Sequence, residues 1–180
     1  MAGIRAAVIV ALLIALSFAG FFFMRSGVKP GIVPTPISGS AFSSALTKAY
    51  ANNTYHFSLF MPDGFAAHES PVDEDGIATI LLQNKSGDGI QIRITPGASS
   101  ARTLSADDIR AGIPELTIEH PEPVAIGADY EGVAFLSDTA AFDGASREVW
   151  FYFRGDLYQI STYARLDGLM KAVFSTWTFL

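Results

Sequence analysis

The sequence predicts an α+β fold: an α/β/α sandwich built on a mainly antiparallel sheet, preceded by one N-terminal transmembrane helix. Three observations predict it. An uncharged apolar run fills residues 6–24, most segments after residue 55 alternate apolar and polar residues, and two short segments repeat apolar residues with helical spacing. Short Gly-containing turns join several of the alternating segments, and such turns connect antiparallel neighbours.

The N-terminal run predicts a membrane anchor. Its 19 uncharged residues would span roughly 28 Å as a helix, close to the ~30 Å of a bilayer's hydrocarbon core. Residues 1–5 would form a short cytoplasmic tail, and the rest would face outside, in the periplasm or at the cell surface. We therefore expect a single-pass protein of the cell membrane that contacts the lipid bilayer through residues 6–24. The alternatives are a signal peptide cleaved after Ala19 and a helix buried in a protein core.

Residues 25–40 are predicted to be a linker. Three prolines, three glycines and three serines in 16 residues favour an extended, flexible chain. The extracytoplasmic domain would then occupy residues 41–180. We expect it to begin with a short helix over residues 41–50, with Phe42, Leu46 and Ala49 on one side.

Strands are predicted next, over residues 55–61, 77–83 and 90–95. In the last of these Ile90, Ile92 and Ile94 alternate with Gln91, Arg93 and Thr95, so one face is expected to be buried and the other wet. Residues 105–114 then carry the signals of a helix, because Ser105 can cap it and two aspartates follow in its first turn. Further strands are expected over residues 116–127 and 130–142.

The segment REVWFYFRGDLYQISTYA, residues 147–164, predicts a hairpin that turns at Gly155 and Asp156. Its two faces would separate cleanly. One would carry Val149, Phe151, Phe153, Tyr158, Ile160 and Thr162, and the other Glu148, Trp150, Tyr152, Gln159, Ser161 and Tyr163. Because both faces are largely apolar or aromatic, a layer is expected on each side of the sheet.

The last segment predicts a helix capped by Asp167, after which WTFL would end the chain as an extended strand or a tail. Its apolar residues would form one stripe that packs on the sheet. They are Leu166, Met170, Val173, Phe174 and Trp177.

Two parts of the domain resemble one known family. The segment YANNTYHFSLFMPDGF, residues 50–65, is similar to the opening pattern of the PsbP-like fold, and residues 147–164 with STWTF at 175–179 resemble its closing pattern. His56 stands where that family usually has glycine. The resemblance covers residues 50–180 and implies an α/β sandwich around an antiparallel sheet. It also implies a protein that docks on partners rather than a catalyst, and it assigns no functional residue.

Charge and motifs narrow the function. Residues 41–180 hold nine Lys and Arg against 18 Asp and Glu, a net charge of −9, which repels phosphate backbones and disfavours nucleic-acid binding. The chain has no cysteine and no nucleophile-elbow, P-loop or dinucleotide motif, so we expect no enzyme, no catalytic residue and no cofactor. His56, His68 and His120 lack metal-ligand spacing, and no metal site is predicted.

Trp150, Tyr152, Tyr163 and Gln159 are the candidate partner-binding residues. Aromatic side chains with polar tips are typical of docking surfaces. The competing interpretation is that a helix, such as residues 41–50, covers them. The sequence thus predicts a non-catalytic, membrane-anchored domain that binds or scaffolds an envelope protein. The alternatives are a small-ligand or metal-ion binding module, for which Glu119, His120 and Glu122 are candidates, and an unrecognised enzyme.

Overall fold

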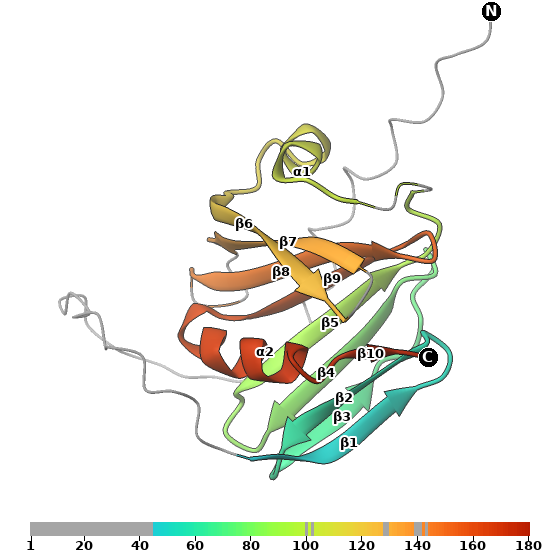
Figure 1. The fold of residues 1–180 in the computed structure, drawn as a ribbon, viewed down its shortest axis with the longest axis vertical. Coiled ribbons are helices and arrows are strands. Elements are labelled where there is room, and N and C mark those ends of the chain that lie inside the picture. The colour runs from blue at the N-terminus through green and yellow to red at the C-terminus, as the bar shows by residue number, and fades with distance from the viewer. Residues whose placement is uncertain (1–44, 100, 102, 128–129, 139–141, 143) are drawn as a thin grey trace, which may run out of the picture.

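The computed structural model describes residues 45–99, 101, 103–127, 130–138, 142 and 144–180 (Figure 1). Their elements are β1 (Leu46–Asn52), β2 (Phe57–Pro62), β3 (Phe65–Glu69), β4 (Ala78–Asn84), β5 (Gly89–Thr95), α1 (Ala106–Gly112), β6 (Glu119–Ile126), β7 (Tyr130–Ser137), β8 (Ser146–Phe153), β9 (Asp156–Tyr163), the 3-10 turn η2 (Ala164–Leu166), α2 (Asp167–Phe174) and β10 (Thr178–Phe179). The predicted anchor and linker, residues 6–24 and 25–40, lie outside the described residues. Among those described, no helix is long and apolar enough to cross a bilayer.

The described strands form two antiparallel sheets. The larger has seven of these strands in the order β3-β4-β5-β9-β8-β7-β6, and the smaller has three in the order β1-β2-β10. The C-terminal strand β10 pairs with the start of β2, where Thr178 lies opposite Ser58 and Phe179 opposite Phe57. The α+β class predicted from the sequence, with its mainly antiparallel sheet, is confirmed.

The main core lies between the two sheets and α2. Period-two alternation in β2, β5, β8 and β9 sends every second side chain into it. Ile90, Ile92 and Ile94 are all buried, as predicted. Aromatic rings fill the centre of the main core: Phe57, Phe151, Phe153, Tyr158 and Trp177.

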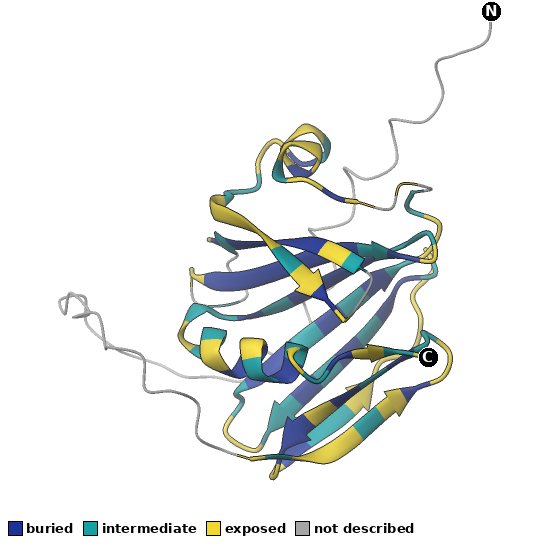
Figure 2. Ribbon diagram, in the orientation of Figure 1, coloured by how far each residue is buried: buried dark blue, intermediate teal, exposed yellow. Residues whose placement is uncertain are grey.

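A second, smaller cluster lies on the opposite face of the seven-stranded sheet. We call it the α1 cluster; its buried members are Leu104, Ile109, Ile113, Val133, Phe135, Trp150 and Leu157. Helix α1 covers only the end of the face formed by β7, β8 and the start of β9, and Figure 2 shows the helix mostly exposed on its outer side. Both faces of the sheet are therefore covered where β8 and β9 lie, as the apolar side chains on both faces of this hairpin predicted.

The expected helix over residues 41–50 is wrong in its described part, and residues 41–44 lie outside the described residues. Residues 46–52 form β1, which pairs with β2 from Leu46 opposite Pro62 to Asn52 opposite Phe57. A few residues of weak helical pattern stabilise little alone, and the hydrogen bonds of the hairpin outweigh that preference. A strand of the second sheet thus stands where the sequence predicted a helical layer.

The turn of the β8–β9 hairpin lies one residue earlier than predicted, so each residue pairs with a partner two positions away from the predicted one. Phe153 pairs with Asp156 and Phe151 with Tyr158, so Arg154 and Gly155 are the turn residues. Their φ angles are 53° and 90°, and the tight turn that suits a hairpin needs positive φ at both central positions. Because the error is an even number of residues, each side chain keeps its predicted face.

Two further local expectations change. His56 lies in the turn before β2 with φ 57°, not within a strand, and its carbonyl accepts a hydrogen bond from the amide of Leu180. Asp167 is the first residue of α2 rather than its cap, because its carboxylate instead contacts Arg147 and Lys171. The predicted C-terminal strand is confirmed as β10.

Candidate functional site

The four residues predicted to bind a partner share one face of β8 and β9, the face that carries α1. Trp150 lies directly opposite Gln159, Tyr152 opposite Leu157, and Tyr163 opposite Ser146. The structure thus brings Trp150, Tyr152 and Gln159 together. Tyr163 lies four residue pairs from the Trp150–Gln159 pair along the hairpin, at the end away from α1.

Trp150 is covered by α1. Only 6% of its surface is exposed, and it packs with Ile109 and Ile113 of the α1 segment and edge-on against Phe135 of β7 at 5.5 Å between ring centres. A helix does cover part of the face, as the competing interpretation required, but the helix is α1 and not residues 41–50. In this conformation Trp150 can contact a partner only through a small remaining surface.

Tyr152 lies half-buried at the rim of a small pocket between α1 and the sheet. The pocket has a volume of about 70 Å³ and is lined by residues including Leu104, Ile109, Trp150 and Leu157, with Asp108 at its edge. Burial raises the pKa of the Tyr152 hydroxyl, and the charge of Asp108 adds to that rise while a hydrogen bond with Ser99 opposes it. The hydroxyl therefore stays protonated and can donate.

Tyr163 is half-buried at the other end of the face. The ring of Phe142 meets it edge-on at 5.3 Å, and the guanidinium of Arg165 lies 4.7 Å from its centre. Arg165 in turn forms an ion pair with Asp88. Tyr163 is thus held in a fixed orientation, with part of its surface open to solvent.

Glu148 is a buried carboxylate that the sequence did not single out. It is 3% exposed and accepts hydrogen bonds from Ser146 Oγ at 2.6 Å, Ser161 Oγ at 2.5 Å and Trp150 Nε1 at 3.1 Å. Burial raises its pKa, while the three donors act in the opposite direction. The signal available in the sequence was an acidic residue within a strand that is otherwise largely apolar and aromatic.

The contacts of Glu148 favour a structural role. A carboxylate that accepts from serine could act as a base toward a nucleophile. Here, however, one carboxylate orders two serines and a tryptophan at once, and Ser146 is fully buried. The group therefore fixes Trp150 and links β8 to β9.

The histidine positions give no metal site within the described part of the chain. No group of three or more His, Asp or Glu side chains is arranged there to hold an ion. His120 lies exposed in the edge strand β6, with φ 49°, where the pairing with β7 shifts between Glu119 and Glu122. His68 is exposed in β3.

Comparison with known proteins identifies the fold. No protein-family model and no curated protein matches the sequence. Among solved structures, the chain is similar to the solution structure of cyanobacterial PsbP (CyanoP) from Synechocystis sp. PCC 6803, with a TM-score of 0.50 and 12% identity over 81% of this chain and 100% of that one. At this identity the similarity is one of fold. The protein therefore has a PsbP-like fold, as the opening and closing patterns of the domain indicated.

Proposed function

We propose that this protein is a non-catalytic docking domain, tethered to the cell membrane by residues 6–24 and facing outside, that binds or scaffolds an envelope protein. One observation carries the proposal. On the face of the sheet that carries α1, the half-buried side chains of Tyr152 and Tyr163 lie on the same two strands as Trp150, whose orientation is fixed. Polar side chains lie between them. Aromatic anchors in a polar setting are typical of protein interfaces.

The charge of the domain indicates the kind of partner. With a net charge of −9 over residues 41–180, the domain attracts a basic protein surface and repels nucleic acid and anionic lipid headgroups. The PsbP-like fold supports a docking role by analogy only, since one fold can carry many functions.

Site-specific photo-crosslinking tests the docking face. A photoreactive phenylalanine analogue would replace Tyr152 or Tyr163 in the full-length chain in its own cells. Phe60, which is 44% exposed on the smaller sheet, provides the matched control. Docking predicts one protein adduct formed from positions 152 and 163 and absent from position 60. No adduct from the first two positions, or the same adduct from all three, would refute the docking face.

Thiol labelling tests the orientation, because the chain contains no native cysteine. Val72, which is 54% exposed, would be replaced by cysteine in the full-length protein. A membrane-impermeant maleimide should label it in cells whose inner membrane is intact. Labelling that requires lysis of that membrane would place the domain inside and contradict the proposal.

A small-ligand module is the second candidate function. The pocket beside Tyr152 favours it, but its volume of about 70 Å³ is well below the roughly 300–1,000 Å³ of typical ligand sites. A compound that raised the melting temperature of the wild type and not of a Tyr152→Ala variant would support this candidate.

A further inference from the structure

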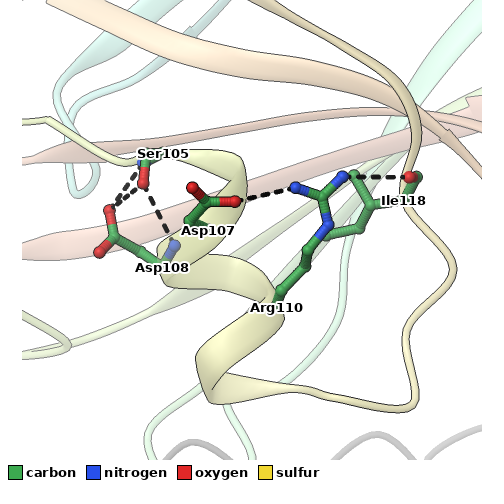
Figure 3. Close-up of polar contacts among 5 residues, drawn as sticks. All are labelled: Ser105, Asp107, Asp108, Arg110 and Ile118. Atoms are coloured by element: carbon green, nitrogen blue, oxygen red, sulfur yellow. Dashed lines mark hydrogen bonds and ion pairs between the residues drawn. The ribbon is translucent and has the colours of Figure 1, made fainter.

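Residues 103–118 form a unit whose polar contacts close on itself. At its start, Ser105 and Asp108 form a capping box: the Asp108 amide donates to Ser105 Oγ, and the Ser105 amide donates back to the Asp108 carboxylate at 2.9 Å (Figure 3). The same bonds hold the pKa of Asp108 below its usual value. The N-terminal end of α1 is therefore satisfied without the sheet.

Arg110 closes the other end of the unit. Its guanidinium pairs with Asp107 at 3.0 Å and also donates to the carbonyl of Ile118 at 3.4 Å (Figure 3). This ties the helix to the segment that leads into β6. The amides of Ile113 and Leu116 are also bonded within the unit.

The unit contacts the sheet through apolar side chains. Leu104, Ile109 and Ile113 rest on a patch made of Val133, Phe135, Trp150 and Leu157. Among the described residues, no hydrogen bond or ion pair of residues 103–118 reaches the sheet. Separating the two surfaces therefore breaks no polar bond between described residues.

The packing at this contact is incomplete. The pocket of about 70 Å³ lies between α1 and the residues beneath it, whereas the main core is interlocked by stacked rings such as Phe57 on Trp177 at 4.4 Å. Few buried contacts and a short, mostly exposed element characterise segments that open locally at low free energy.

We propose that residues 103–118 form a lid, which opens as one body while the two sheets stay folded and uncovers Val133, Phe135, Trp150 and Leu157 for the docking partner. The use of this patch rests on the proposed function, whereas the opening itself does not. Trp150 is prepared for this role, because Glu148 holds its indole nitrogen independently of α1. The patch then meets a partner without losing the order of its central side chain.

Thiol reactivity tests the opening in the full-length protein without any partner. Val133→Cys places a thiol under the lid, and Val149→Cys places one in the main core. Both are Val→Cys changes at buried positions of the same sheet, in a chain with no other cysteine. We expect Val133→Cys to react with a thiol reagent about 100-fold faster than Val149→Cys. Equal rates would mean that the thiols are reached only by global unfolding and would overturn the lid.

Weakening the contact between the lid and the patch supplies a second measurement. Adding Ile109→Ala removes a buried side chain from that contact and should raise the Val133→Cys rate at least ~10-fold. An unchanged Val133→Cys rate would show that the thiol is reached by some route other than lid opening. Because no partner is present, failure of this experiment and failure of the crosslinking experiment are distinguishable.

Discussion

The main core and the α1 cluster occupy opposite faces of one sheet and are built very differently. Among the described residues, the main core contains 21 buried members and is closed by chain segments far apart in sequence, since β10 completes the smaller sheet beside β2. The α1 cluster contains seven described members, and helix α1, with two turns, covers it. The first arrangement provides stability, and the second leaves one part of the domain free to move.

Ion pairs strengthen the contrast. Arg147, whose side chain is 9% exposed, links β8 to Glu122 of β6 and to Asp167 of α2, and Lys171 extends the network from Asp167. The α1 unit has its own ion pair, but it joins residues of the unit only. The main core is thus tied across elements, whereas the α1 unit is tied to itself.

The largest expected difference comes from truncating one buried ring in each region. Phe151→Ala removes a fully buried ring stacked on Tyr158 and should cost about 3–5 kcal/mol of unfolding free energy. Phe135→Ala removes an equally buried ring, but its cost should be roughly half or less, because the protein can open the lid instead of retaining a cavity. Denaturant unfolding measures both. Equal losses would place the two clusters in one cooperative unit.

Removing the central cation of the ion network should have a smaller effect. Arg147→Met removes the cation that pairs with both Asp167 and Glu122. The substitution should lower the unfolding free energy by about 2–3 kcal/mol, which is less than for a fully buried network because both carboxylates are partly exposed. Lys171→Met, at the exposed partner of the same Asp167, should cost under ~1 kcal/mol. Similar losses in the two variants would contradict the bridging role of Arg147.

Glu148 should make stability depend on pH. Its pKa is higher in the folded than in the unfolded protein, so the folded state binds more protons, and stability falls as the pH rises through the interval between the two values. Glu148→Gln keeps the shape and most hydrogen bonds without the charge and should remove this contribution. The measurement is the unfolding free energy of both proteins from pH 4 to about pH 8. A pH profile that is unchanged in the variant would contradict the assignment.

The smallest expected effect on global stability comes from the cap of α1. Ser105→Ala alone should lower the unfolding free energy by under ~1 kcal/mol, because the cap stabilises only the short helix α1. The same change should increase trypsin cleavage after Arg110, because loss of the cap frays the helix around that bond. Cleavage that stays at the wild-type rate would indicate that the cap does not stabilise α1.

Much of the fold could be predicted from period-two patterns. The alternation of Ile90, Ile92 and Ile94 fixes which face of β5 is buried, and Ser105 with its following aspartates marks the start of α1. The hairpin faces were also predicted correctly despite a wrong register, because an even shift conserves them. These features depend on local spacing, which a sequence displays directly.

The rest depends on contacts between distant segments. Residues 46–52 form a strand because β2 is available to pair with them, which overrides the local helical pattern. The position of α1 over Trp150 and the burial of Glu148 between β8 and β9 arise from the sheet order. For the same reason, the candidate partner-binding residues could be assigned to one face from the sequence. Which of them α1 covers and which stay half-exposed could not be predicted.

Native-state hydrogen exchange tests most directly whether the two regions open separately. In the full-length protein, the amides of Ile109 and Ile113, both bonded within the α1 unit, would be compared with amides of the central strands β5 and β9 at low denaturant concentrations. A helix of two turns is too short to stay formed off the sheet, so lid opening should expose these amides to exchange. We predict that the α1 amides exchange at least ~100-fold faster and with a weaker denaturant dependence, while the strand amides follow global unfolding. The same opening free energy and the same denaturant dependence for both sets would contradict a lid that opens on a folded domain.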